Sequence, residues 1–498
     1  MLEMLPLYYD GKSQPAPAGT PQLTLKAPAT GEPYAQVPLS DAASVDRVVR
    51  SAQSAFPAWR DTPVAERARV LFRYRQLLEG EAESLARIVS HDHGKTLADA
   101  KGEVQRGIEV VEFACGMPSL MQGDTVDDVA RGIACRSIRR PLGVCAGIVP
   151  FNFPVMVPMW MFPVAIAAGN TFVLKPSERV PRAALRLAEM FREAGLPPGV
   201  FNVVHGAREA VDALIEHPAT RAVSFVGSEP VARDVYRKAG QQGKRVQALS
   251  GAKNHLVVMP DADLAKTVEG IMGGAYGSAG ERCMAVSVVV AVGEAGDALV
   301  DKLKESASGL TVGPGDAPES EMGPLISAEH KARVTGYIEK GQAEKARLVL
   351  DGRRHPRAKD PGNFLGPTLF DRVAPGMTVY RDEVFGPVLS VVRAGTLDEA
   401  IALVNGNPYG NGAAIFTSSG AAAAKFQAEV AAGMVGINVA VPVPLAFFPF
   451  AGWKNSFFGD LHAHGKDGVA FYTETKVVTS RWFSEAGPGG KNMTIALR

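Results

Sequence analysis

In the early part of the chain, hydrophobic residues recur at intervals of three and four positions, as at Leu71 and Tyr74. This spacing places their side chains on one face of a helix. It predicts helices over residues 42–56, 64–94 and 96–119. These segments give the first part of the chain a strongly helical character.

A different pattern, the alternation of hydrophobic with polar or charged residues, runs through residues 126–143. Such alternation is typical of a half-buried strand or hairpin. Residues 476–479, near the end of the chain, form another candidate strand. We expect this strand to pair with the 126–143 segment and to build an arm that favours oligomerisation.

Apolar strands and helices alternate after Gly143, which indicates parallel sheets covered by helices on both faces. In the first half, we expect strands over residues 144–149, 171–174, 201–204 and 222–226, and a helix over 183–194. In the second half, we expect strands over residues 256–259, 286–292, 348–351 and 388–392. The predicted fold is therefore α/β, with doubly wound parallel sheets and a β-hairpin arm.

Composition and charge narrow the class of protein. The chain has 498 residues, of which 46% are hydrophobic and 21% are charged, and its formal net charge is +1. This is ordinary globular composition, and the length suggests about three structural units. A net charge near zero provides neither a basic field for nucleic acid nor a polybasic surface for anionic lipid.

The cysteine content and the apolar segments bear on cellular location. Four cysteines are too few for a disulfide scaffold, so we expect a reducing, cytoplasmic compartment. Residues 1–20 lack the features of a secretory or transit signal. Residues 141–174 contain no charged residue, but prolines such as Pro150 and Pro154 interrupt them. We therefore expect a buried strand, turn and helix there rather than a membrane span.

Cys283 is the strongest candidate nucleophile. It lies in the segment Tyr276-Gly-Ser-Ala-Gly-Glu-Arg-Cys283, whose glycines allow a ligand to approach the backbone closely. Arg282 beside it favours the thiolate, the reactive form of cysteine. The alternative is a small buried cysteine that only packs, which is our interpretation of the other three cysteines.

Two segments at strand ends carry candidate polar groups. Asn152, in Pro150-Phe-Asn-Phe-Pro154, follows a predicted strand, where its amide can donate to an oxyanion or simply belong to a turn. Phe225-Val-Gly-Ser228 ends another strand, and Ser228 is the expected N-cap of the next helix. A helix N-terminus of this kind can bind a pyrophosphate, although no G-x-G-x-x-G fingerprint is present.

Lys175 and Glu178 follow a third strand. Lys175 can donate to ribose hydroxyls and Glu178 can accept from them, and a carboxylate there disfavours a 2′-phosphate. An exposed ion pair is the alternative. The groups His91-Asp-His93 and Asp460-Leu-His-Ala-His464 lack metal-ligand spacing and are expected in loops, so no metal is predicted. No G-x-S-x-G or P-loop motif supports a hydrolase or kinase.

Together these segments, with Glu383-Val-Phe-Gly-Pro387, resemble the aldehyde dehydrogenase superfamily in order and spacing over essentially the whole chain. The resemblance implies an NAD-binding domain over residues 1–122 and 143–249 and a catalytic domain over 250–455. It also implies an oligomerisation arm and tail over 123–142 and 472–498.

By the same resemblance, Cys283 attacks the aldehyde, and Asn152 with the Cys283 backbone N–H stabilises the oxyanion. The residues implied in cofactor binding are Phe151, Lys175, Glu178, Arg179, Gly227, Ser228, Ser250 and Glu383.

The sequence departs from the family pattern at one chemically important position. Where most members have Glu-Leu-Gly-Gly-Lys, this chain has Leu249-Ser-Gly-Ala-Lys253, and residues 452–467 contain no glutamate either. Leucine cannot accept a proton from water, and losing a general base typically costs roughly 10²–10⁴-fold in rate. A thiol such as coenzyme A is a better nucleophile and needs less help to release the acyl group.

Several stretches, among them Gly280-Glu-Arg-Cys-Met-Ala285, resemble the CoA-acylating methylmalonate-semialdehyde dehydrogenase branch of the superfamily. That branch implies NAD-dependent oxidation and decarboxylation of methylmalonate or malonate semialdehyde to propionyl-CoA or acetyl-CoA. Arg106 and Arg282 are the candidate carboxylate ligands, since guanidinium binds carboxylate bidentately. Each can instead belong to a structural salt bridge.

Three questions stay open from the sequence. The first is whether the acyl-enzyme is released to CoA, or to water as in a hydrolytic aldehyde dehydrogenase. The second is whether the chain is instead a non-catalytic protein that keeps the fold. The third is whether the expected homo-oligomer is a dimer or a tetramer.

Overall fold

The computed structural model describes residues 2–482, and its first half is built on an eight-stranded sheet. Five neighbouring strands of this sheet, from β12 to β10, are parallel, and antiparallel strands flank them. In spatial order the strands are β22 (Phe457–Phe458), β12 (Arg245–Leu249), β11 (Thr220–Val226), β8 (Val144–Ile148), β9 (Thr171–Lys175), β10 (Phe201–Val203), β2 (Leu7–Tyr9) and β3 (Lys12–Gln14).

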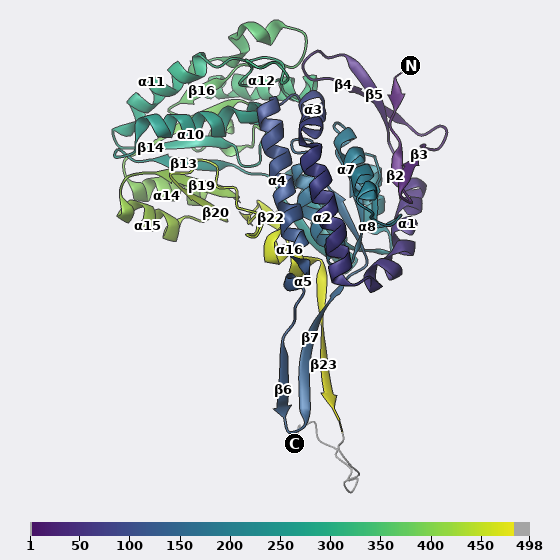
Figure 1. The fold of residues 1–498 in the computed structure, drawn as a ribbon. Helices are drawn as coiled ribbons and strands as arrows, with labels where there is room; N and C mark the ends of the chain where they lie inside the picture. The colour runs from purple at the N-terminus through teal and green to yellow at the C-terminus, as the bar shows by residue number, and fades with distance from the viewer. Residues whose placement is uncertain (1, 483–498) are drawn as a thin grey trace.

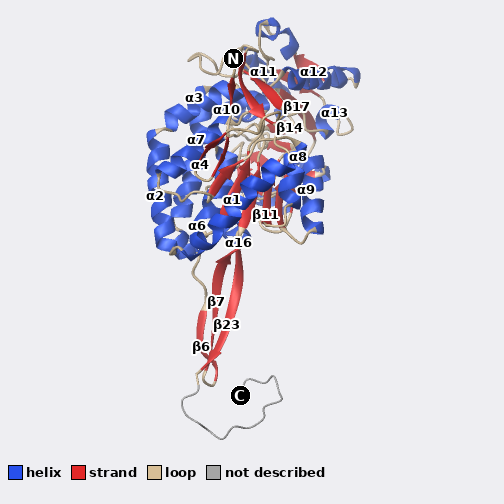
Figure 2. Cartoon of the chain, turned by 90° about the vertical axis from the view of Figure 1, so that its right-hand side faces the viewer, coloured by secondary structure: helices blue, strands red, loops and turns tan. Residues whose placement is uncertain are grey.

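Helices cover both faces of this sheet (Figures 1 and 2). Successive strand residues point to opposite faces, so Cys145 and Ala146 belong to two different hydrophobic clusters. One face is covered by α1 (Ala42–Asp61), α8 (Arg208–Glu216) and α9 (Glu229–Gln241). The other is covered mainly by α2 (Val64–Gly80), α3 (Ala82–His93), α4 (Leu97–Cys115), α6 (Met156–Ala167) and α7 (Arg182–Glu193). The predicted doubly wound sheet is confirmed.

The charge-free segment of residues 141–174 forms β8, α6 and β9. Every residue of α6 is buried, which explains why this helix is hydrophobic on all sides. Trp59 fixes it further by donating to the Ile166 carbonyl oxygen at 2.9 Å. Among the residues that the structure describes, no helix has the length and apolar character needed to cross a membrane.

The second half contains a seven-stranded sheet that is parallel except for its first edge strand. Its spatial order is β15 (Arg347–Leu350), β16 (Thr368–Asp371), β17 (Val388–Ala394), β14 (Val286–Val292), β13 (Asn254–Val258), β19 (Gly412–Phe416) and β20 (Met434–Ile437). Its helices are α10 (Leu264–Tyr276), α11 (Ala295–Ser308), α12 (Ala328–Ala343), α13 (Thr378–Arg381), α14 (Leu397–Gly406) and α15 (Gly420–Glu429). We call the units built on the two sheets the first and second domains; their assignment to cofactor binding and catalysis stays a prediction.

A three-stranded arm projects from the body of the molecule (Figure 1). It consists of β6 (Thr125–Ala130), β7 (Ile133–Pro141) and β23 (Thr473–Arg481), with β7 in the middle. Nine residue pairs join β23 to β7 in antiparallel register. The predicted pairing of residues 476–479 with the 126–143 segment is therefore confirmed; the tail residues 483–498 lie outside the described residues.

Smaller elements complete the chain. A sheet of β1 (Glu3–Met4), β5 (Pro33–Pro38) and β4 (Gln22–Lys26) precedes α1, and β18 (Tyr409–Gly410) pairs with β21 (Trp453–Lys454). The remaining helices are α5 (Met117–Leu120), α16 (Gly465–Phe471) and three 3₁₀ turns, η1 (Gly277–Gly280), η2 (Gly352–Arg354) and η3 (Pro356–Lys359).

The predicted helical boundaries differ from the structure in three places, one of which is Gly116, where residues 96–119 are divided into α4 and α5. The segment of residues 64–94 is interrupted at Glu81, which separates α2 from α3. The first helix continues five residues beyond the predicted end at Phe56, because Pro57 lies inside it without ending it. His91 and His93, expected in a loop, lie in the last turn of α3.

Asn170 joins the base of the arm to the body. Its carbonyl oxygen accepts from the backbone N–H groups of Leu142 and Gly143, at 2.7 and 3.1 Å. Its amide donates to the carbonyl oxygens of Ala165 and Tyr472, at 3.0 and 2.9 Å. One fully buried side chain thereby connects α6, both ends of the arm and the first domain.

We predict that Asn170→Ala lowers the free energy of unfolding by about 3–5 kcal/mol, because it leaves several buried backbone groups without partners. A lower Tm in a thermal unfolding assay checks this. Gln53→Ala, on an exposed position of α1, is the matched control. Equal Tm values for both variants would contradict the assigned role of Asn170.

Candidate active site

Cys283 lies at the boundary between the two domains, in the short segment between η1 and β14. Its backbone carbonyl oxygen accepts from two side-chain amides, those of Asn254 at 2.9 Å and Asn411 at 3.1 Å. Its half-buried side chain lines two cavities, one toward α4 and α6 and one toward Glu383. The two amides fix the backbone of Cys283, and the residue borders a cavity on each side.

Asn152 is brought to this cysteine segment from the first domain. It follows β8, and its side-chain amide donates to the carbonyl oxygen of Glu281 at 3.0 Å. Glu281 is two residues before Cys283, so the amide lies beside the candidate nucleophile. An amide has two N–H groups, so one remains for another acceptor.

A buried ion pair holds the Asn152 loop in place. Lys95 and Glu103 are both fully buried, and their charged atoms are 2.7 Å apart. The Lys95 ammonium also donates to the backbone carbonyl oxygen of Asn152 at 2.6 Å. The other oxygen of Glu103 accepts from the backbone N–H groups of Val155 and Met156, at 2.8 and 3.2 Å. Both ends of the loop are thus fixed by one pair of charges.

The ionisation of Cys283 differs from the prediction. Burial raises the pKa of its thiol to about 12, the nearby Glu383 carboxylate contributes to the increase, and Arg282 offsets part of it. The expected effect of Arg282 is therefore right in sign, but burial outweighs it. In the ligand-free protein the sulfur is a thiol at neutral pH.

The predicted cofactor segments follow four neighbouring strands. Phe151 follows β8, Lys175 ends β9, Gly227 follows β11 and Ser250 follows β12. Because these strands are parallel, their carboxyl ends meet at one edge of the sheet. The chain order reverses direction between β8 and β11, and ligands of open α/β sheets bind in the crevice at such a switch point.

Lys175 and Glu178 form a partly buried pair at this edge. The Lys175 ammonium donates to Glu178 at 3.2 Å and to the Gly206 carbonyl oxygen at 2.9 Å. Burial alone raises the pKa of Glu178, but Lys175 and a backbone hydrogen bond lower it overall, so the carboxylate is charged. Arg179, which follows, is half-exposed and lies 3.8 Å from Glu329 of α12.

The groups after β11 and β12 are free to receive a ligand. The Ser228 side chain occupies the N-cap position of α9, as predicted, but makes no hydrogen bond to the helix. The Ser250 hydroxyl is buried and also has no partner. A Cβ at Gly227 would lie 2.5 Å from the Phe225 ring, so only glycine fits there without rearrangement.

Glu383, from the loop after α13, faces the same small cavity as Cys283. Its carboxylate accepts from the Ala252 backbone N–H at 2.9 Å. Burial raises its pKa to about 7, against the effects of that hydrogen bond and of Lys253. Phe151 packs edge-on against Phe385, which brings the loop after β8 close to the Glu383 loop.

The two predicted substrate arginines line one cavity of about 260 Å³ together with Cys283. Apolar side chains including Phe153, Trp160 and Phe450 form its other walls. Arg106 lies 2.7 Å from Glu109, and Arg282 lies 2.6 Å from Asp99. Each arginine is thus held in a salt bridge and also faces the cavity.

Sequence reasoning missed several residues that build this site. Lys95, Glu103 and Asp99 lie on or before a predicted helix, where charged residues are usually exposed, so no sequence signal identified them. The buried carboxyl of Glu281 lies 3.6 Å from His93 and 3.4 Å from His330. No group of three or more His, Cys, Asp or Glu side chains within residues 2–482 is arranged to hold a metal ion.

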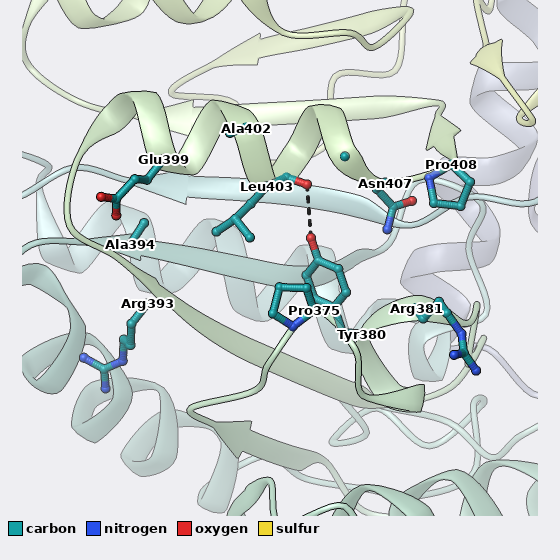
Figure 3. A pocket seen from close by; sticks show the side chains of 11 residues that line it. Pro375, Tyr380, Arg381, Arg393, Ala394, Glu399, Ala402, Leu403, Asn407 and Pro408 are labelled. Carbon is teal, nitrogen blue, oxygen red and sulfur yellow. Dashed lines mark hydrogen bonds between the residues drawn. The ribbon is translucent and has the colours of Figure 1, made fainter.

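A larger cavity, of about 680 Å³, lies against α13 and α14 (Figure 3). The Tyr380 hydroxyl crosses it to donate to the Leu403 carbonyl oxygen at 3.1 Å. It contains none of the candidate catalytic groups. Its size therefore does not make it the active site.

This chain is similar to known proteins over most of its length. A family model described as "Aldehyde dehydrogenase family" matches residues 16–478. Malonate-semialdehyde dehydrogenase 2 of Geobacillus kaustophilus is 58% identical over 455 residues, which are 91% of this chain and 94% of that protein.

Two solved structures are similar over nearly their whole length. The methylmalonate-semialdehyde dehydrogenase DddC of Oceanimonas doudoroffii has a TM-score of 0.95 at 50% identity, covering 97% of this chain and 99% of that chain. A Sinorhizobium meliloti structure complexed with NAD has a TM-score of 0.96 at 48% identity, with the same coverage.

We predict that iodoacetamide modifies Cys283 slowly at pH 7 and faster as the pH rises. Below its pKa, the thiolate fraction of a thiol grows about tenfold per pH unit. Peptide mass spectrometry of the ligand-free protein between pH 7 and 10 measures this. Glu383→Gln should shift the profile to lower pH, because it removes a charge that raises the thiol pKa; a plateau below pH 8 would contradict the assignment.

Proposed function

The chain belongs to the aldehyde dehydrogenase family, and we propose that it oxidises malonate or methylmalonate semialdehyde with NAD and transfers the acyl group to coenzyme A. One observation carries the proposal: Cys283 lines a cavity together with Arg106 and Arg282, and the Asn152 amide binds the cysteine segment at the Glu281 carbonyl oxygen. The names of the relatives, malonate- and methylmalonate-semialdehyde dehydrogenase, support the substrate class.

The first step is attack of the Cys283 sulfur on the aldehyde carbon. The thiol gives its proton to water in this step, and the oxygen of the aldehyde becomes an oxyanion. The free N–H of the Asn152 amide and the Cys283 backbone N–H stabilise that charge; a donor of this kind typically contributes about 3–4 kcal/mol. Because Lys95 fixes the Asn152 backbone, the amide does not have to reorganise during the reaction.

The crevice beside Cys283 fits NAD, which when bound accepts the hydride from the tetrahedral adduct. The Ser250 hydroxyl, buried and without a partner, provides a donor or acceptor at this edge. The charged Glu178 can accept from ribose hydroxyls and disfavours a 2′-phosphate. Glu383 lines the same small cavity as Cys283, and we propose that it accepts hydrogen bonds from the hydroxyls of the nicotinamide ribose. The NAD complex of the Sinorhizobium meliloti structure supports this choice.

The product of oxidation is a thioester on Cys283. Its β-carboxylate leaves as CO₂, since the thioester accepts the electron pair of the broken C–C bond. Arg106 and Arg282 orient that carboxylate in the cavity. The resulting enolate takes up a proton from water at the α-carbon. The acyl group is then transferred to the CoA sulfur, and the proton of the CoA thiol ends on the released Cys283 sulfur.

Transfer to CoA rather than water follows from Leu249. This residue is buried at the end of β12, in the hydrophobic cluster against which Cys283 packs. It cannot accept a proton from water, and a thiol nucleophile needs less help. Glu383 favours a second candidate function, hydrolysis to a carboxylic acid, because its pKa of about 7 and its shared cavity with Cys283 suit a general base.

Assembly and location complete the proposal. The arm exposes Val126, Val129 and Val477 although a three-stranded sheet this isolated has no core of its own. We therefore propose a homo-oligomer, a dimer or a tetramer, whose mass light scattering would measure. All four cysteines are free, which supports a reducing, cytoplasmic compartment.

We predict sustained NADH formation from malonate semialdehyde only when CoA is present, with acetyl-CoA as the product. Without CoA, NADH formation should stop after about one equivalent per active site, because the thioester persists. Cys283→Ala should abolish both phases, and stopped-flow absorbance with product analysis measures them. Equal turnover without CoA, with free acid as the product, would establish the hydrolytic alternative.

We predict that Leu249→Glu introduces CoA-independent formation of acid. A general base typically accelerates such a step by roughly 10²–10⁴-fold, so even an imperfect geometry should give a measurable rate. Leu249→Gln, which has the same shape without the base, is the control. Identical rates for the two variants would show that position 249 does not govern the fate of the thioester.

A further inference from the structure

Each arginine of the substrate cavity is paired with a carboxylate from α4. Asp99 lies in the first turn of this helix, where its backbone N–H donates to the Thr96 side chain. Glu109 lies further along the same helix and holds Arg106. Two arginines and two carboxylates leave the local charge balanced, so net charge alone does not attract an acidic substrate.

Asp99 contacts Arg282 and the turn before Cys283 at the same time. One carboxylate oxygen accepts from the Arg282 guanidinium at 2.6 Å. The other accepts from the backbone N–H and the hydroxyl of Ser278, at 3.0 and 3.2 Å. A single side chain of the first domain therefore fixes both the arginine and the start of the cysteine segment.

The turn that Asp99 holds is unusual. Ser278, Ala279 and Gly280 have φ values of 50°, 52° and 72°, so three consecutive residues are left-handed. Two of them carry a Cβ, and this conformation is unfavourable for such residues. The bonds from Asp99 to Ser278 provide the contacts that keep the turn in this form.

The Arg282 guanidinium is held in place by several hydrogen bonds. Besides Asp99, it donates to the Ser278 hydroxyl at 3.4 Å and to the Gly273 carbonyl oxygen at 3.2 Å. A Cβ at Gly277 would lie 2.5 Å from the guanidinium, so the absence of a side chain there leaves room for the guanidinium in this position. These contacts use three of the five N–H groups of the arginine, and two remain for a ligand.

The remaining N–H groups belong to a side chain that lines the cavity next to Cys283. Because the guanidinium is planar, fixing one nitrogen on Asp99 and the other two on Ser278 and Gly273 sets the direction of the remaining N–H groups. An arginine held in this way can bind a carboxylate at a defined distance from the sulfur without searching for a rotamer.

We propose that Asp99 is a positioning residue for substrate specificity: it aims Arg282 so that the cavity selects aldehydes with a carboxylate. The proposal rests on the proposed function, because it requires an acidic semialdehyde as substrate. Asp99 does not touch the reacting atoms and acts through Arg282.

Asp99→Asn separates the two contacts of this side chain. The amide oxygen of asparagine can still accept from Ser278, so the turn keeps its support. Its NH₂ group cannot accept a hydrogen bond from Arg282, so the guanidinium is no longer held in one orientation. Glu112→Gln, which removes a charge from an exposed position of the same helix, is the matched control.

The test compares malonate semialdehyde with propanal, which has the same chain length and no carboxylate. For Asp99→Asn we expect the KM for the semialdehyde to rise about tenfold or more, the size typical of a lost charge-assisted hydrogen bond. The kinetic constants for propanal should stay close to those of the wild type. Glu112→Gln should leave the kinetic constants for both substrates unchanged.

Two outcomes have distinct meanings. If wild type shows no preference for the semialdehyde over propanal, the proposed function itself fails. If wild type prefers the semialdehyde but Asp99→Asn lowers kcat/KM equally for both substrates, Asp99 is structural and the positioning role is overturned.

A second variant covers a failure of Asp99→Asn to fold. Arg282→Lys keeps the positive charge but cannot make all three fixed contacts and bind a carboxylate with a planar edge. The proposal expects the same selective rise in KM for the semialdehyde. An unchanged ratio between the two substrates would overturn it.

Discussion

The candidate active site depends on one buried ion pair, that of Lys95 and Glu103. Two opposite charges removed from water are stable only when they are paired and their remaining hydrogen-bonding capacity is used. Here the remaining hydrogen bonds of both side chains are made with the backbone of the loop that carries Asn152. Losing one partner of such a pair typically destabilises a protein by about 3–5 kcal/mol, so the loop geometry is tied to the stability of the fold itself.

The same end of α4 connects the two domains. From this region Asp99 binds Ser278, and the backbone N–H of Leu97 donates to the Gly315 carbonyl oxygen at 2.8 Å. The candidate nucleophile Cys283 comes from one domain, and Asn152, whose amide binds its segment, comes from the other. Their alignment is consequently a property of the interface, which explains why so many buried polar contacts are concentrated there.

The sheets and the arm were predictable because their signals are local. Continuous apolar strands after Gly143 and the alternation of apolar with polar residues in parts of residues 126–143 are visible in the sequence and correspond to β8 and the arm. Cys283 and Asn152 were identifiable as candidates because each lies in a recognisable sequence motif. The salt bridges of Lys95 and Asp99 were not identifiable from the sequence. A charged residue in a helical pattern gives no indication that packing between distant segments buries it.

The arm has a consequence for how the protein is made. Its central strand β7 precedes most strands of the two large sheets in the chain, whereas its longest partner, β23, follows all of them. Until both sheets have been synthesised, only the β6–β7 hairpin of the arm is available, and an isolated hairpin is marginally stable in water. In the homo-oligomer proposed above, the arm is therefore complete only after both domains have been synthesised.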